Sequence, residues 1–182
     1  MIIMNNNQMA TLGGGCFWCI EAIFQRVEGV NSVVSGYSGG NTENPTMEEI
    51  YGGDTHHAEV IQLTFDPNII SYKDLLEIFF VMHDPTTLNR QGNDIGEEYR
   101  SIIFYHNDDQ KKVAESSTKN FAAKLWKDPI VTEVVPYKKF WPAEENQQNF
   151  FNNNSQVGYC QVIINPKVQK LRQEFSSKLK AV

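Results

Sequence analysis

Two cysteines stand three residues apart, directly after a run of three glycines. Cys16 and Cys19 open a helical pattern that runs to about Glu28. The free N–H groups and the positive dipole end at a helix start stabilise an anion. We therefore predict that Cys16 has a lowered pKa and is a reactive thiolate. Phe17 and Trp18 follow it and can form an apolar pocket around the sulfur, although an inert, buried Cys16 is the alternative.

Glu59 is the most informative carboxylate of the chain. It lies in a predicted strand, residues 58–65, and shares its side of that strand with three apolar residues, Ile61, Leu63 and Phe65. A carboxyl on the apolar face is desolvated, so its pKa rises and its protonated form can act as a general acid. The alternative is a glutamate at the strand end that simply reaches water.

A long polar segment, residues 83–98, is too rich in Asp, Asn and Gly to be a core element. A connector of this length favours a functional role. With the residues just after it, it offers Asp94, Tyr99 and Arg100 as a rim of polar groups over the thiol. A surface loop held by Asx turns is the alternative.

A metal site receives little support from the sequence. Cys16, Cys19 and one histidine could nominally bind zinc. His56 and His57 are adjacent near a strand and point in opposite directions, so they form a poor pair of ligands. There is no second Cys pair and no His-x-x-x-His spacing, and we expect no metal and no cofactor.

The elements that must position these residues alternate between helices and strands. Strands are predicted at residues 9–12, 30–37, 58–65, 101–105 and 130–135. Besides the helix at Cys16, helices are predicted at 46–51, from Ser71 to Met82, from Asp108 or Asp109 to Trp126, from Pro142 to Phe151, and from Asn165-Pro166 onward.

The central order is strand, helix, strand, strand, helix, strand. This order indicates an α+β fold, a ferredoxin-like split βαβ two-layer sandwich with a mainly antiparallel sheet. The last helix is then a C-terminal helical extension. No linker divides the chain, so residues 1–182 are expected to form a single domain.

Composition limits the class of function. The formal charge of −6 and the lack of a long Lys/Arg run argue against nucleic-acid binding. No apolar stretch is long enough to span a membrane, and we expect a cytoplasmic protein. Three cysteines do not make a disulfide framework of the secreted kind. A Cys-x-x-Cys pair in a reducing compartment indicates redox catalysis or metal binding.

Several motifs in the same order resemble the peptide methionine sulfoxide reductases of the A type. They extend from about residue 10 to Ile164 and comprise Gly15-Cys16-Phe17-Trp18, Gly36-Tyr37-Ser38-Gly39-Gly40, residues 53–59 (GDTHHAE), His83-Asp84-Pro85, residues 90–94 (RQGND) and Tyr99-Arg100-Ser101.

The resemblance implies thiol-dependent reduction of methionine-S-sulfoxide, free or in proteins, as a repair of oxidative damage. In this family the residue matching Cys16 attacks the sulfoxide sulfur and becomes a sulfenic acid, and the acid matching Glu59 protonates the oxygen. Phe17 and Trp18 match residues around the substrate methyl group. A second cysteine then forms a disulfide that thioredoxin reduces. We expect a monomer.

Asp94 and Tyr99 match family residues that position the sulfoxide oxygen. Met47 departs from the pattern, because many members have there a tyrosine that hydrogen-bonds this oxygen. Residues four apart share a helix face, so Tyr51 could bring its hydroxyl into the same pocket. The alternative is that Tyr51 only packs.

The resolving thiol has two candidates. Cys19, where many members have glycine, is three residues from Cys16, and such residues lie about 5 Å apart on a helix. Cys160 follows an Asn-rich stretch, residues 152–155, that we expect to be flexible. It also matches the family's Gly-Tyr-Cys resolving position. We therefore predict a Cys16–Cys160 disulfide, with Cys19 as the alternative or as a relay.

Two other functions compete with sulfoxide reduction. A general thiol–disulfide oxidoreductase also has Cys-x-x-Cys at a helix start, but it needs neither the split βαβ order nor a buried acid. A zinc-binding interaction module would use the two cysteines without catalysis.

Overall fold

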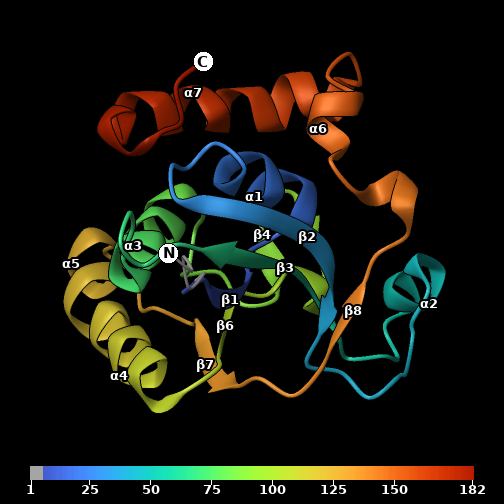
Figure 1. Ribbon diagram of the computed structural model, residues 1–182. Coiled ribbons are helices and arrows are strands. Elements are labelled where there is room, and N and C mark those ends of the chain that lie inside the picture. The colour runs from blue at the N-terminus through green and yellow to red at the C-terminus, as the bar shows by residue number, and fades with distance from the viewer. Residues whose placement is uncertain (1–5) are drawn as a thin grey trace.

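One six-stranded sheet organises the computed structural model, which describes residues 6–182 (Figure 1). The first five residues of the expected domain lie outside this range. Neighbouring strands follow the order β7-β6-β1-β3-β2-β8, and every pair is antiparallel except β6–β7. The strand bounds are β1 (Gln8–Gly13), β2 (Val30–Ser38), β3 (Ala58–Phe65), β6 (Ile102–Tyr105), β7 (Glu133–Pro136) and β8 (Phe140–Pro142).

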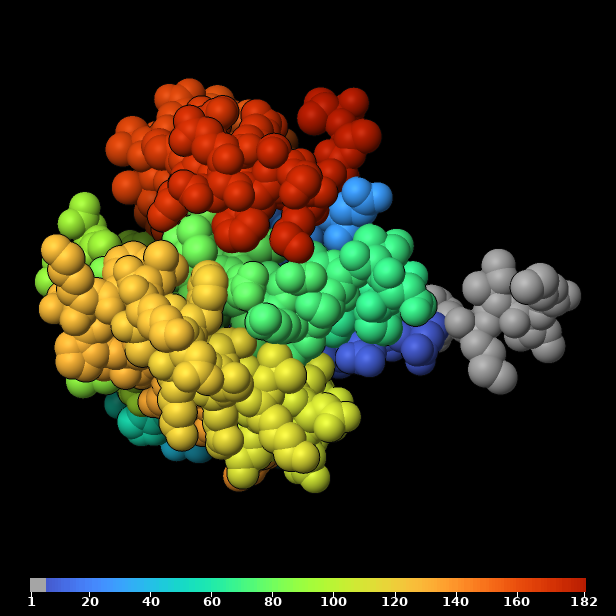
Figure 2. Space-filling model, turned by 90° about the vertical axis from the view of Figure 1, so that its left-hand side faces the viewer, coloured from blue at the N-terminus to red at the C-terminus, as the bar shows by residue number. Residues whose placement is uncertain are grey.

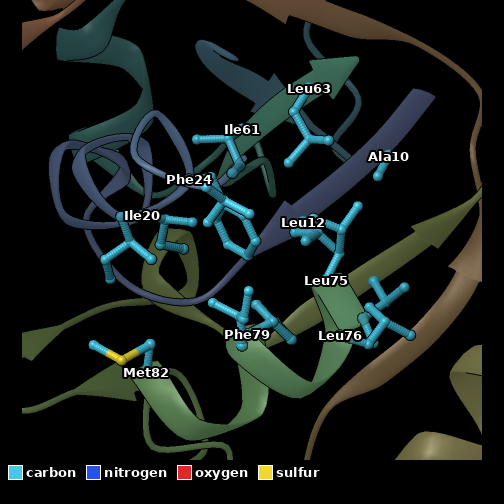
Figure 3. Packing of buried hydrophobic residues seen from close by; sticks show 14 of the residues in the cluster. Ala10, Leu12, Ile20, Phe24, Ile61, Leu63, Leu75, Leu76, Phe79 and Met82 are labelled. Atoms are coloured by element: carbon cyan, nitrogen blue, oxygen red, sulfur yellow. The ribbon is translucent and has the colours of Figure 1, made fainter. Parts of the chain in front are cut away.

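Two helices, α1 (Phe17–Phe24) and α3 (Tyr72–Met82), pack on one face of this sheet. Figure 3 shows side chains of β1 and β3 pointing toward those of α1 and α3, with labelled members Ala10, Leu12, Ile61, Leu63, Ile20, Phe24, Leu75, Leu76, Phe79 and Met82. Strand residues two apart face the same side, and helix residues three or four apart do too, so both patterns fill one core. The predicted α+β class is confirmed.

Local signals placed several elements correctly. Ser71 and Asp74 form the capping box that starts α3, as predicted. Thr46 and Glu49 form a second capping box at α2 (Met47–Gly52). The polar segment 83–98 contains a small hairpin of β4 (Arg90–Gln91) and β5 (Asp94–Ile95).

Two predicted element starts are displaced along the chain. Asn107, not Asp108 or Asp109, caps α4 (Asp108–Ser116), because its side chain accepts the N–H of Gln110. A π-helical stretch, Ser117–Ala122, and α5 (Ala123–Leu125) continue that helix. The predicted strand 130–135 begins only at Glu133.

Pro142 does not open a helix. It ends β8, an edge strand paired with β2 at Gly36, where the missing proline N–H costs no ladder bond. Only short helical pieces follow, a 3₁₀ turn at Glu145–Gln147 and α6 (Phe150–Asn153). This part of the chain runs in an extended path along the edge of the molecule (Figure 1).

The last helix starts earlier than predicted. Helical geometry begins at Gly158, passes through a π-helical stretch, Cys160–Ile164, and continues as α7 (Asn165–Glu174). Pro166 lies inside it, and a π-helical turn before a proline relieves the loss of an N–H donor. This segment packs on α1 and α3 and forms one end of the molecule (Figures 1 and 2). Across residues 6–182, no helix combines the length and apolarity that crossing a membrane requires.

Candidate active site

Close neighbours leave room only for glycine at positions in the turn between β1 and α1. Gly15 has φ +94°, and a Cβ there would lie 2.6 Å from the side chain of Gln91. A Cβ on Gly13 would lie 2.9 Å from the carbonyl oxygen of Glu59. The turn can therefore bring Cys16 next to β3 only because these positions have no side chain.

Cys16 is the N-cap residue of α1 and is only 9% exposed. Burial raises the pKa of the Cys16 thiol, its hydrogen bond with Cys19 and the negative charge of Glu59 raise it further, and the N–H of Trp18 opposes them. The predicted lowering of this pKa is therefore wrong, because the helix-start argument omitted desolvation.

The pKa of Cys19, not that of Cys16, is the one that the surroundings lower. Its hydrogen bond with Cys16 lowers the pKa of Cys19 to about 6, against the effect of burial, and the positive charge of Lys167 acts in the same direction as the hydrogen bond. The hydrogen bond between the two thiols therefore raises the pKa of Cys16 and lowers that of Cys19.

Glu59 lies at the inner face of β3, as its parity predicted, and is 1% exposed. Its Oε2 accepts the backbone N–H of Phe17 at 2.9 Å, one residue after Cys16. Burial raises the pKa of Glu59 to about 8, and the charges of Glu98 and Asp94 add to this. The carboxyl is therefore mostly protonated at neutral pH, with a proton to give beside Cys16.

Tyr51 brings a hydroxyl group to Glu59, and the Tyr99 hydroxyl lies next to that of Tyr51. Tyr51 donates to Glu59 Oε1 at 3.5 Å, and the two tyrosines are hydrogen-bonded to each other. Burial and the charge of Glu59 raise both tyrosine pKa values, so both hydroxyls remain donors. Met47 packs against the core one turn earlier in α2. Tyr51 therefore does more than pack.

Trp18 is enclosed by residues from the C-terminal part of the chain. Its Nε1–H donates to Gln147 Oε1 at 3.0 Å, and its ring stacks on Phe150 with centroids 3.7 Å apart. Tyr159 meets it edge-on at 5.8 Å. Phe17, in contrast, is fully buried in the main core beside Tyr37. No local sequence pattern points to these partners, because about 130 residues or more separate each of them from Trp18.

Tyr159 links two predicted site residues that are far apart in the chain. Its hydroxyl donates to Asp94 Oδ2 at 2.7 Å and lies 3.7 Å from Cys19 Sγ. Cys160, the next residue, is fully buried in the helical stretch. The stretch 152–155 that was predicted to be flexible precedes this helical stretch, and Cys16, Cys19 and Cys160 belong to one buried cluster.

Other candidates lie away from the thiols. Arg100 donates to the carbonyl oxygens of Glu97 and His56 and lines a cavity of about 370 Å³ with Lys138 and other residues. His56 contacts Glu97, whereas the other histidine, at 57, contacts the loop at residues 40–42, so the two diverge as expected. Within the described range, no group of three His, Cys, Asp or Glu residues could hold a metal ion.

Comparison with known proteins identifies the family of this chain. The family model described as peptide methionine sulfoxide reductase matches residues 8–179. The peptide methionine sulfoxide reductase MsrA of Sulfolobus acidocaldarius is 54% identical over 171 residues, which cover 94% of this chain and 97% of that protein.

Solved structures agree with the sequence match. Mxr1 from Saccharomyces cerevisiae in reduced form superposes with a TM-score of 0.76 at 34% identity, over 85% of this chain and 89% of the other. Mxr1 in complex with Trx2 superposes with a TM-score of 0.53 at 26% identity, over 79% and 84%. The site has a buried thiol after a glycine turn and a buried glutamate beside it. Together with the family model and these relatives, this shows that the chain belongs to the peptide methionine sulfoxide reductase family, A type.

Proposed function

We propose that this chain reduces methionine-S-sulfoxide, free or in proteins, by attack of Cys16 on the sulfoxide sulfur. Glu59 gives the oxygen a proton, methionine leaves, and Cys16 becomes a sulfenic acid. A second cysteine, Cys160 or Cys19, then forms a disulfide, and thioredoxin reduces it. The yeast relative solved in complex with Trx2 supports thioredoxin as the reductant.

One observation supports this proposal most strongly. Glu59 is buried, has a pKa of about 8, and is tied by its hydrogen bond to the residue that follows Cys16. The S–O bond of the sulfoxide breaks readily only once its oxygen is protonated, and a carboxylic acid neutral at pH 7 provides that proton while the oxygen passes to Cys16 as the sulfenic OH. Simple thiol chemistry would not need such a group.

Three further side chains complete the proposed pocket. Tyr51 and Tyr99 donate hydrogen bonds to the sulfoxide oxygen, since the Tyr51 hydroxyl contacts Glu59 and the Tyr99 hydroxyl is hydrogen-bonded to Tyr51. Asp94 positions this oxygen through a neighbour or water. Trp18 contacts the substrate methyl group, and its stack on Phe150 fixes the ring. Phe17 supports this wall from the core.

The test is methionine release from each epimer of free methionine sulfoxide, with dithiothreitol and then with thioredoxin as reductant. We expect turnover of the S epimer only, and none by Cys16→Ser, because a hydroxyl cannot form a sulfenic acid. Turnover by Cys16→Ser would remove Cys16 from the nucleophile role. Equal turnover of the two epimers would contradict the proposed substrate class.

A second candidate is general dithiol–disulfide exchange, which the hydrogen-bonded Cys16–Cys19 pair at a helix start favours. The same preparation should be tested for reduction of insulin disulfides. Faster insulin reduction than sulfoxide reduction would make exchange the main activity.

We also assign the central strands β6-β1-β3-β2 to a ferredoxin-like arrangement within one domain. The support is their neighbour order, their antiparallel pairing, and helices α1 and α3 between β1 and β2 and between β3 and β6. We expect a monomer. Three free thiols suit the reducing cytoplasm.

A further inference from the structure

The two edges of the six-stranded sheet are joined by a very short connection. Strands β7 and β8 are the opposite edge strands, yet only three residues, Tyr137, Lys138 and Lys139, connect them. Six flat strands would hold these edges about 24 Å apart, whereas the four peptide steps from Pro136 to Phe140 reach at most about 14 Å. The sheet must therefore curl until its edges nearly meet, and Figure 1 shows the chain passing directly from β7 to β8.

A cavity of about 370 Å³ lies within this curl. It is lined by the end of β2, at residues 38–40, by Ile102 and Phe104 of β6, and by Val135 of β7. Cavities of this size hold small organic molecules, and the interior of a closed or nearly closed sheet is one of the places where such sites occur. The curl thus provides a cavity with an apolar floor.

This cavity and the thiol site lie on opposite faces of the sheet. The two β6 side chains of the floor belong to an apolar cluster with Ala58 and Val60. Ala58 and Val60 alternate with Glu59 along β3, so they point to the other face. A molecule in the cavity therefore does not occupy the space next to Cys16.

Arg100 brings a buried positive charge to this cavity. It is 8% exposed and is one of the lining residues. Of the five N–H donors of a guanidinium, two donate to the carbonyl oxygens of Glu97 and His56. The carboxylate of Glu133 is 3.7 Å from Nε, too far for a hydrogen bond, and its side chain is 48% exposed. The buried guanidinium therefore keeps donors that an anion can use.

The rim of the cavity adds further positive charge. Lys138 and Lys139 also line it, and both are exposed. The Ser38 hydroxyl donates to the carbonyl oxygen of Lys139, which ties the connection between the edge strands to β2. Among the described residues that line the cavity, three cations thus stand against one carboxylate, that of Glu133.

We propose that this cavity is a binding site for a small organic carboxylate with an apolar body. The carboxylate accepts the remaining N–H groups of Arg100 and is attracted by Lys138 at the rim, while the body lies on the apolar floor. Such a ligand completes the pairing of a buried charge that Glu133 leaves open. Glu133 also disfavours a dianion such as phosphate. The site is independent of the proposed sulfoxide reduction.

Titration calorimetry with 3-phenylpropionate tests the site, with 3-phenylpropanamide and 2-phenylethylamine as probes that keep the apolar body. The acid should bind about 10- to 100-fold more tightly than the neutral amide, the effect of one hydrogen bond to a charged group, and the amine should not bind. Phenylalanine carries the same carboxylate beside an ammonium group. Binding tighter than that of the acid would assign the ligand to amino acids, and weaker binding would assign it to simple acids.

Variants locate the bound acid. Val135→Phe fills the cavity and should abolish binding, whereas Lys138→Gln removes an exposed charge at the rim and should weaken it. Arg100→Gln should reduce the affinity for the acid to that for the amide. Lys119→Gln changes an exposed lysine that does not line the cavity, so it should bind as the wild type does. Thermal unfolding checks each fold, and Lys138→Gln keeps every contact of Arg100.

Two-dimensional amide NMR separates this cavity from the thiol site. Saturating 3-phenylpropionate should shift the signals of residues 38–40, 102–104 and 133–139 and leave those of residues 16–19 in place. Shifts confined to residues 16–19 and 51–59 would overturn the proposal, as would unchanged binding in both Val135→Phe and Lys138→Gln. So would binding of the amide within about twofold of the acid, or no binding of the acid at about 10 mM.

Discussion

Glu59 Oε2 and the backbone N–H of Phe17 are 2.9 Å apart, so a central strand and the first turn of α1 are joined at the candidate nucleophile. The acid cannot move away from Cys16 without breaking this hydrogen bond. Its proton is therefore held in place by the fold before any substrate binds.

Replacement of Glu59 by glutamine tests this acid. Glu59→Gln keeps the shape but has no acidic proton, so single-turnover methionine release should slow by about 10² to 10⁴-fold. Rapid quench with excess enzyme measures this step. The exposed Glu115→Gln is the matched control and should match the wild type. A loss under about threefold would mean that another group provides the proton.

The same residue makes stability depend on pH. The pKa of Glu59 is about 8 in the folded chain and about 4.3 in an unfolded one. Below pH 4 both states hold the proton, and between pH 4 and 8 only the unfolded state loses it. Wild-type stability should therefore fall by on the order of 4 kcal/mol across this window through Glu59 alone.

Urea unfolding of wild type and Glu59→Gln at pH 4.5, 6 and 8 measures this effect as a difference. The advantage of the glutamine variant should grow with pH and level off above about 8. Glu115→Gln should show no such trend. A constant difference between Glu59→Gln and wild type would place the Glu59 pKa near its ordinary value.

Replacement of Tyr51 tests whether its hydroxyl compensates for the tyrosine that many family members have at the position of Met47. Tyr51→Phe should lower kcat/KM by about 10- to 100-fold, the equivalent of roughly 1.5 to 3 kcal/mol for one hydrogen bond to a polar or charged group. Met47→Tyr in the Tyr51→Phe background should restore part of the loss, because it returns a hydroxyl to the same pocket. Tyr105→Phe is the control. Unchanged kinetics in Tyr51→Phe would leave Tyr99 as the acting hydroxyl.

Glu21 is a buried carboxylate that holds the C-terminal part of the chain. It accepts the Phe150 N–H and the Ser35 hydroxyl, each at 3.1 Å. Glu21→Ala leaves both donors unpaired and should destabilise the fold by about 1 to 3 kcal/mol per donor. It should also speed proteolysis within residues 149–158, which the change of an exposed glutamate, Glu28→Ala, should not do. Equal proteolysis rates for the two variants would show that Glu21 does not hold this segment.

The sequence was sufficient to predict features that follow from local rules, such as side-chain parity in a strand and capping at a helix start. The parity of Glu59 predicted its burial, and the Ser71 capping box predicted the start of α3. The Cys16 pKa could not be predicted in the same way, because desolvation depends on what packs over the thiol. Pro142 was misassigned because a proline that opens a helix and a proline that ends an edge strand look alike locally.

The residues that enclose Trp18 could not be predicted from local sequence patterns either. Gln147, Phe150 and Tyr159 gave no pattern of their own, and their contacts with Trp18 and Cys19 arise from tertiary packing. The Asn-rich stretch before Cys160 suggested flexibility, but the thiol itself lies in a helical turn.

The separation between Trp18 and Gln147, 129 residues, has a consequence for synthesis. At about 5 to 20 residues per second, Gln147 is added roughly 6 to 26 s after Trp18. During this interval Cys16 and Cys19 belong to a nascent chain whose covering segment does not yet exist. Their protection from alkylation and oxidation is therefore one of the last properties that the growing chain acquires.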